Sequence, residues 1–334
     1  MKELIKNLVE TFGPAGSEDG VRELVAAEVR EAADSVRTDA LGNLIATVRG
    51  KGGGRRIMLA AHMDEIGIVV GHIDAKGFVR FGAVGGVPRQ TLVGSRVRFA
   101  DGRVGVIGSE QKRIEGDLPR LDQLFIDVGA ADRVGAPVKV GDVACFDRPF
   151  ADLGGRLVAK AMDDRIGCAV LVQVLKELGE TPHEVHFVFT VQEEVGLRGA
   201  QTSAYGIEAE LGIAVDVTPT GDTPEAHTME VGLGLGPAIK VKDRGMLAHP
   251  GVRRWLVETA RREGLPYQLE VLEAGTTDAA AMQTTRAGMP VGVLSIPTRY
   301  VHTPSEMVDY GDVLGAVRLL LALLRGPVDL GSPS

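Results

Sequence analysis

Histidines and acidic residues follow the most apolar stretches of this 334-residue sequence. They are His62 and Asp64 at the end of IMLAAHMD, Glu193 and Glu194 after FVFTV, Asp216 in IAVDV, His302 after VGVLSIP, and Asp163 and Asp164 before a predicted helix at Arg165. Runs of this kind predict buried strands. Ligands of open α/β sheets bind beyond the carboxyl ends of the strands. We therefore expect these side chains to meet at one site.

The predicted cluster offers imidazoles and carboxylates but no thiolate. This donor set suits zinc, cobalt or manganese in a hydrolytic site. Without cations, converging carboxylates would repel one another and raise some of their pKa values. Divalent metal ions would relieve that repulsion, so the cluster favours a metal site.

Each of these residues has a simpler interpretation when it is taken alone. A histidine at a strand end such as His62 is more often a hydrogen-bonded structural residue, Glu193–Glu194 alone would be a solvated turn, and Asp163–Asp164 would cap a helix. Asp64, however, lies two residues after His62 on the same strand face, where it can hold the imidazole ring. The combination is more specific than any of its members.

The elements that position these residues alternate between strands and helices. Helices are predicted at 4–12, from a cap at Ser17 to about 33, and then near 165–178, 198, 251–263, 279–286 and from 310. Strands are predicted in LIATV, IMLAAHMD, EVHFVFTV, LGIAVDV, YQLEV and PVGVLSI. This order predicts an α/β fold, a mixed sheet flanked by helices on both faces.

From about residue 66 to residue 150, a series of short β-rich runs interrupts the alternation of strands and helices. Six short β-rich runs are separated there by Gly, Asp and Pro turns: IGIVVGHI, GFVRFG, TLVGSRVRF, RVGVIGS, LFIDVG and DVACF. Such spacing predicts a small β-barrel or sandwich, and we expect the barrel. We expect a catalytic α/β domain over 1–66 and 155–334, with a β-domain inserted over 67–154.

The composition favours a soluble enzyme and argues against nucleic-acid and membrane partners. Apolar residues make up 44% and charged residues 25%, as in a soluble globular enzyme, and the net charge of −8 argues against a nucleic-acid partner. Cys145 and Cys168 lie outside any CxxC motif, which favours free buried thiols over a disulfide. The N-terminus lacks the features of a signal peptide, and no apolar run of about 18 residues is present. We expect a cytoplasmic protein without a membrane partner.

Five segments carry a resemblance to a known family. They are AHMDEIG (61–67), AMDDRIG (161–167), VQEEVGLRGA (191–200), AVDV (214–217) and YVHTPSE (300–306). In this order they resemble the signature blocks of the dinuclear metallo-aminopeptidases called tetrahedral or TET aminopeptidases. That family includes glutamyl aminopeptidases and cellulase-M-like proteins. The resemblance spans nearly the whole chain and implies a zinc-exopeptidase-like fold that removes N-terminal residues from peptides.

The resemblance also implies roles for individual residues. It implies two divalent metal ions per subunit, zinc or cobalt with manganese as an alternative. The implied ligands are His62 and Asp216 for one ion, Glu194 and His302 for the other, and Asp163 as the bridge between them. Glu193 would be the general base, Asp64 would orient His62, and the Asp163–Asp164 peptide bond would be cis.

Peptides are the implied substrates, and the inserted β-domain would pair subunits in a homo-oligomer of twelve. Segment 273–282 resembles a stretch near the family's substrate pocket, but it carries Thr276-Thr277 where a single Thr is usual. The preferred N-terminal residue is therefore not predicted.

Three alternatives remain at this stage. The first is a co-catalytic zinc deacylase or carboxypeptidase on the same scaffold. The second is a glycosidase, which would use two carboxyl groups about 5 to 9 Å apart without metal and would leave the histidines without a purpose. The third is a non-enzymatic shell protein, which has no use for so many buried charges.

Overall fold

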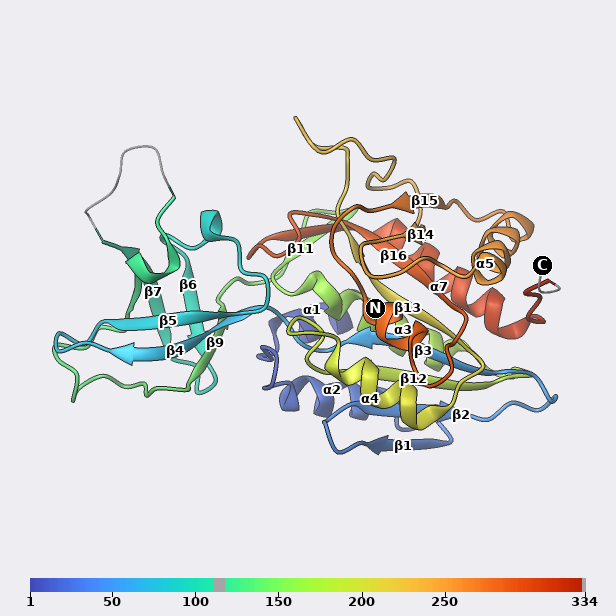
Figure 1. Cartoon of the computed structure of the whole chain (residues 1–334), viewed down its shortest axis with the longest axis horizontal. Coiled ribbons are helices and arrows are strands. Elements are labelled where there is room, and N and C mark those ends of the chain that lie inside the picture. Colours follow the sequence, from blue (N-terminus) through green and yellow to red (C-terminus); the bar gives the residue numbers. More distant parts are fainter. Residues whose placement is uncertain (111–117, 332–334) are drawn as a thin grey trace.

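A computed structural model describes residues 1–110 and 118–331 of the chain. Figure 1 shows a large helix-covered sheet on one side and a smaller barrel of strands on the other. The predicted combination of a mixed sheet, flanking helices and an inserted β-barrel is confirmed.

The large sheet has eleven strands among the described residues, in the order β1-β2-β12-β3-β13-β16-β17-β11-β10, with β14 beside β16 and β15 beside β14. The strands are β1 Ser35–Thr38, β2 Leu44–Val48, β3 Arg56–His62, β10 Ala151–Asp152, β11 Arg156–Ala159, β12 Glu184–Thr190, β13 Leu211–Thr218, β14 Ala238–Lys242, β15 Gln268–Val271, β16 Val291–Arg299 and β17 Glu306–Asp309.

The centre of this sheet is parallel. Strand β3 runs parallel to both β12 and β13, and β13 runs parallel to β16. His62 pairs with Thr190 across β3 and β12, at the last residue of each strand. Parallel strands end at one edge of a sheet, so the residues that follow them are brought together there.

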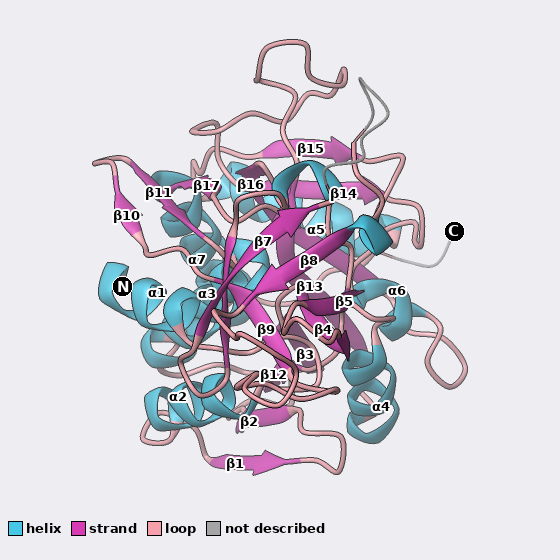
Figure 2. Ribbon diagram, turned by 90° about the vertical axis from the view of Figure 1, so that its left-hand side faces the viewer, coloured by secondary structure: helices cyan, strands magenta, loops and turns pink. Residues whose placement is uncertain are grey.

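Helices cover both faces of the sheet. They are α1 Lys2–Glu10, α2 Asp19–Val29, α3 Met162–Glu177, α4 Arg198–Ile207, α5 Pro250–Arg262, α6 Asp278–Gln283 and α7 Tyr310–Arg325. Alternate residues of β3 face opposite ways, since Ile57 and Leu59 pack with α1, α2, α3, α5 and α7, whereas Met58 and Ala60 pack with α4 and α6. Figure 2 separates α1, α2, α3 and α7 from α4 and α6 on the two sides of the strands.

The inserted strands close into a barrel in the order β4-β5-β8-β7-β6-β9. They are β4 Gly67–Ile73, β5 Val79–Val84, β6 Arg96–Phe99, β7 Val104–Ser109, β8 Leu124–Asp127 and β9 Val143–Phe146, with short 3₁₀ turns at Arg89–Thr91 and Leu121–Gln123. The barrel has its own apolar core, which includes Ile68, Val97 and Ile126. All six predicted β-rich runs therefore contain a barrel strand, while β10 already pairs with β11 of the large sheet.

Several local expectations differ from the structure. Ser17 does not cap the second helix, which begins at Asp19 after Glu18 and ends at Val29. Strands β1, β10, β11, β14 and β17 were not predicted, because they are short or carry polar residues on one face. Cys145 and Cys168 are free and buried, as predicted. None of the helices in the described ranges is long and apolar enough to cross a membrane.

Candidate metal centre

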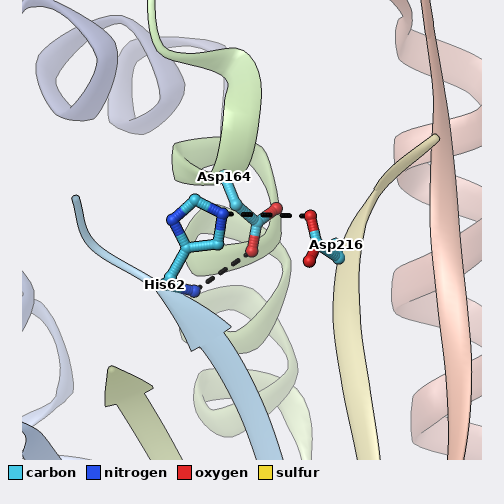
Figure 3. A group of neighbouring side chains, drawn as sticks. All are labelled: His62, Asp164 and Asp216. Carbon is cyan, nitrogen blue, oxygen red and sulfur yellow. Dashed lines mark hydrogen bonds and ion pairs between the residues drawn. The ribbon is translucent and has the colours of Figure 1, made fainter. Parts of the chain in front are cut away.

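The first group of ligand-type side chains lies where β3, β13 and the start of α3 meet. His62, Asp164 and Asp216 each present a possible ligand atom within 4.8 Å of the others (Figure 3). All three are at most 5% exposed. Asp164 accepts hydrogen bonds from the backbone N–H groups of His62 (3.2 Å) and Gly167 (3.1 Å). Both of its oxygens are thus engaged with backbone, which fixes the end of β3 against α3.

The second group consists of Asp163, Glu194 and His302, again with possible ligand atoms within 4.8 Å of one another. His302 Nε2 lies 3.3 Å from Asp163 Oδ2 and 3.2 Å from Glu194 Oε1. Asp163 Oδ1 lies 3.0 Å from Nε2 of His62 in the first group. Asp163 is therefore the carboxylate between the two histidines, and the structure brings all five sequence-predicted ligands together.

Asp64 supports both groups. It is completely buried, and its carboxylate accepts hydrogen bonds from the backbone N–H groups of Glu193 (2.9 Å) and Glu194 (3.1 Å). The same carboxylate lies 3.5 Å from His62 Nδ1, whose nearest partner is the Asp64 carbonyl oxygen at 3.1 Å. Asp64 thus holds the Glu193–Glu194 segment as well as the imidazole ring beside it.

Backbone strain gathers at the same place. Ala161, Gln192 and His302 adopt the left-handed conformation with φ of 55°, 55° and 62°, although none of them is glycine. Such conformations cost free energy and persist where the surrounding structure imposes them, often at functional sites. The turn at Gln192 directs the chain after β12 into the site. The peptide bond between Asp163 and Asp164 is cis, as the resemblance implies.

Two further supports of the second group were not predicted as site residues. Glu306 is buried and accepts hydrogen bonds from the N–H groups of Asp163 (3.0 Å) and His302 (2.7 Å). The carbonyl oxygen of Gly86, in the loop after β5 of the barrel, lies 3.0 Å from His302 Nδ1. Glu306 ends the segment YVHTPSE and could have been found from that motif. No sequence signal points to Gly86.

The electrostatics of the cluster reflect an excess of carboxylates. Burial raises the pKa values of Glu193 and Asp216 well above their ordinary range, and burial likewise raises that of Glu194. Burial alone would lower the pKa of His302, but the carboxylates of Asp163 and Glu194, 3.3 Å and 3.2 Å from its Nε2, outweigh this effect and raise the pKa to about 12. Burial would raise the pKa of Asp163, but its contacts with the His302 and His62 rings outweigh that effect and lower this pKa.

This arrangement fits bound cations. Several buried carboxylates converge on two histidines here, and such a concentration of negative charge is stabilised by positive charge. Among the described residues, Glu194 Oε1 is buried without a hydrogen-bond donor of good geometry, although His302 Nε2 lies 3.2 Å away. Imidazole nitrogens and carboxylate oxygens are the ligands of zinc, cobalt and manganese. Cys168 takes no part as a ligand, because its Sγ donates to the carbonyl oxygen of His62 (3.1 Å).

A pocket of about 450 Å³ opens over both groups. Its walls include the predicted base, Glu193, and all five predicted ligands: His62, Asp163, Glu194, Asp216 and His302. The segment around residue 274, which resembles a substrate-pocket stretch, also lines it through Ala274, Gly275 and Thr276. The remaining histidines, for example His183 and His186, lie outside this pocket.

A helix-covered mixed sheet with two adjoining histidine and carboxylate groups at its strand ends fits the class of metal-dependent hydrolases. The model of the M42 glutamyl aminopeptidase family matches residues 42–319. A relative from Acetivibrio thermocellus, which carries a provisional aminopeptidase name, is 50% identical over 96% of this chain and 97% of its own. This chain belongs to the M42 family and is an aminopeptidase.

Solved structures agree with this assignment. An aminopeptidase from the archaeon Desulfurococcus kamchatkensis is 43% identical and superposes with a TM-score of 0.92 over 97% of this chain and 94% of that one. The TET1 peptidase of Pyrococcus horikoshii, which can assemble into a tetrahedron or a large octahedral shell, is 33% identical with a TM-score of 0.88 over 97% and 98% of the two chains. The enzyme class and fold expected from the sequence are thereby confirmed.

Proposed function

We propose that this aminopeptidase works with two divalent metal ions, zinc or cobalt with manganese as an alternative, held by the two groups described above. His62 and Asp216 would bind one ion, and Glu194 and His302 would bind the other. The observation that carries this proposal is the position of Asp163, whose two oxygens lie 3.0 Å and 3.3 Å from the Nε2 atoms of the two histidines. One carboxylate can serve both ions only from such a position.

Asp164 is the nearest competitor for the bridging role, because it belongs to the first geometric group. Its oxygens accept backbone hydrogen bonds, from His62 and Gly167, whereas those of Asp163 face the histidine rings. We therefore assign ligation to Asp163 and the positioning of His62 to Asp164.

When bound, the metal ions supply Lewis-acid polarisation of the scissile carbonyl and make water acidic enough to react near neutral pH. Glu193 lines the pocket beside the ligands, and its backbone is fixed by Asp64. We assign it the transfer of the proton from the attacking water to the leaving amine. Asp64 fixes the position of Glu193 and of its neighbour Glu194 during this transfer.

The base assignment can be tested by Glu193→Gln, which keeps the shape of the side chain and removes the proton acceptor. General bases contribute about 10²- to 10⁴-fold, so kcat should fall by at least about 100-fold. The bound metal, measured by elemental analysis, should be unchanged. Glu258→Gln on the exposed face of α5 is the matched control and should leave both quantities at the wild-type level. Near wild-type turnover of Glu193→Gln would show that another group is the base.

The deacylase or carboxypeptidase reaction on the same scaffold is the alternative to separate from the proposed mechanism. Peptides with a free amino terminus and their N-acetylated counterparts should be compared on chelator-stripped enzyme, with and without added zinc or cobalt. Metal-dependent release of the first residue from the free peptides alone is the expected result. Cleavage of the acetylated peptides would contradict a mechanism that requires a free α-amino group.

We also propose that the chain forms a homo-oligomer, with the barrel of β4 to β9 as the pairing domain and twelve subunits as the full assembly. The support is the assembly of the similar TET1 peptidase into closed shells. Sedimentation velocity would test the number of subunits. The cytoplasmic location expected from the sequence stays a prediction, which cell fractionation would test.

A further inference from the structure

The wall of the active-site pocket divides into a polar part and an apolar part. The polar part holds the two ligand groups and Glu193. The apolar part is contributed by the ends of several different strands and the loops after them: Leu197, Val217, Pro219, Leu272, Ala274 and Val301. A substrate whose scissile carbonyl faces the ligand groups must place its first side chain against the remaining wall.

One charged side chain lines the pocket apart from the ligand groups and the base, among the residues that the structure describes. It is Lys240 on β14, and it is 1% exposed. Its Nζ lies 2.8 Å from Glu270 Oε1 and 3.6 Å from Asp243 Oδ2. Two buried carboxylates thus already neutralise this ammonium group.

The partner of Lys240 is itself held firmly. Glu270 accepts hydrogen bonds from the hydroxyl groups of Thr218 (2.8 Å) and Ser295 (2.6 Å). To bind an acidic substrate side chain, Lys240 would have to give up its ion pair with Glu270. Glu270 would then be a buried carboxylate without a cation. Removing one partner of a buried ion pair leaves an uncompensated charge, which is strongly unfavourable.

Within the described ranges, the pocket wall offers no free partner for a basic substrate side chain either. The carboxylates of the pocket wall belong to the ligand groups, to Glu193 or to the catalytic support around them. The neighbouring Glu273 is not part of the wall, and it pairs with Lys242 at 3.0 Å in a solvent-exposed position. An incoming ammonium group would therefore lose its hydration without gaining a free carboxylate partner on the wall that the structure describes.

We infer that the enzyme selects peptides that begin with an uncharged, apolar residue, and that Leu272 contributes to this selection. The inference rests on the proposed function, because it places the scissile carbonyl at the ligand groups. A pocket of about 450 Å³ accommodates the first residue and the backbone that follows it.

The test compares the p-nitroanilides of leucine, glutamic acid and lysine on the metal-loaded wild-type enzyme. We expect kcat/KM for the leucine compound to exceed the other two by at least about 100-fold, as when a site must desolvate a charge without a partner. Equal or faster hydrolysis of either charged compound would overturn the inference while leaving the aminopeptidase assignment intact. Hydrolysis of none of the three would overturn the proposed function, and the inferred selectivity with it.

The variant Leu272→Lys adds a cation to the apolar wall. It should raise the ratio of glutamate to leucine hydrolysis by at least tenfold relative to the wild type. The matched control is Leu269→Lys. Leu269 lies in β15, three residues before Leu272, but it is 50% exposed and outside the pocket, so this variant should leave the ratio unchanged. An equal change in both variants would exclude Leu272 as a specificity residue. Circular dichroism establishes that both variants are folded before the ratios are compared.

Discussion

The contact between the inserted barrel and the second ligand group can be tested with one methyl group. Gly86 follows β5, and its carbonyl oxygen lies 3.0 Å from His302 Nδ1. A Cβ atom at Gly86 would lie 2.9 Å from the same Nδ1 and 3.0 Å from the ring Cε1. Ordinary van der Waals contact begins near 3.4 Å, so Gly86→Ala must displace the ring or the loop by roughly half an ångström.

The displacement should weaken metal binding more than folding. Overpacking of a well-packed site costs about 1–3 kcal/mol, and a lengthened hydrogen bond to His302 adds about 1 kcal/mol. Groups that orient a metal-binding histidine typically change metal affinity by about 10- to 100-fold when they are altered. We therefore expect the dissociation constant of the ion proposed at Glu194 and His302 to rise by about 10- to 100-fold. The ion at His62 and Asp216, which do not touch Gly86, should bind as before.

The assay is a competition titration of the apo-enzyme against a chromophoric chelator, which resolves the two binding steps. Gly82→Ala is the matched control, since it makes the same change on β5 and its nearest neighbour would be Val69 Cγ1 at an ordinary 3.6 Å. Both binding constants of that variant should equal those of the wild type. Identical titrations for Gly86→Ala and Gly82→Ala would refute the view that the barrel loop positions His302.

Three further predictions follow from buried or paired charges. Glu306→Gln places an amide donor against one of the two backbone N–H groups of Asp163 and His302. Metal affinity in the same titration should therefore fall by about 10- to 100-fold. An unchanged affinity would contradict the view that Glu306 positions these two residues. Lys240→Met leaves Glu270 without its cation and should lower the free energy of unfolding by about 3–5 kcal/mol in denaturant titrations, whereas a loss below 1 kcal/mol would show that the pair is not buried. Arg299 lowers the pKa of Asp222, so this pair stabilises the fold above the unfolded pKa of about 3.9, and the stabilisation is lost as the pH falls through the folded pKa. Asp222→Asn should therefore cost about 1 kcal/mol at pH 7, with a deficit that shrinks below about pH 4, while Asp122→Asn in the fully exposed pair with Arg120 should show no difference at either pH.

The positions of several proposed ligands could be predicted from the sequence because these residues stand at or just after buried apolar strands, whereas their individual roles came from the family resemblance. His62 ends β3, Asp216 lies near the end of β13, and the segment with Glu193 begins three residues after β12. Apolar runs identify these strands, and parallel strands share one edge for their carboxyl ends. The six barrel strands could also be predicted from the sequence, because turn residues separate the short β-rich runs at regular intervals.

The supports of the site were harder to predict, because they depend on contacts between distant segments. Gly86 and His302 are separated by 216 positions, and nothing in either local sequence records their contact. Lys240 stands in a run that includes further polar residues, and lysine is almost never fully buried unless it is paired. Its burial follows from Glu270, which arrives on a different strand.

The two ligand groups differ in how the fold holds them. The first is built on the sheet itself, since His62 is the last residue of β3 and its N–H group is fixed by Asp164 at the start of α3. The second depends on loops, because His302 follows β16 in a left-handed turn and keeps its ring in place through Glu194, Asp163 and the barrel carbonyl of Gly86. His302 also has a side chain that is 31% exposed, compared with 2% for His62. A perturbation of the barrel therefore reaches the second group first, which is why Gly86 rather than a residue of β3 is the informative position to change.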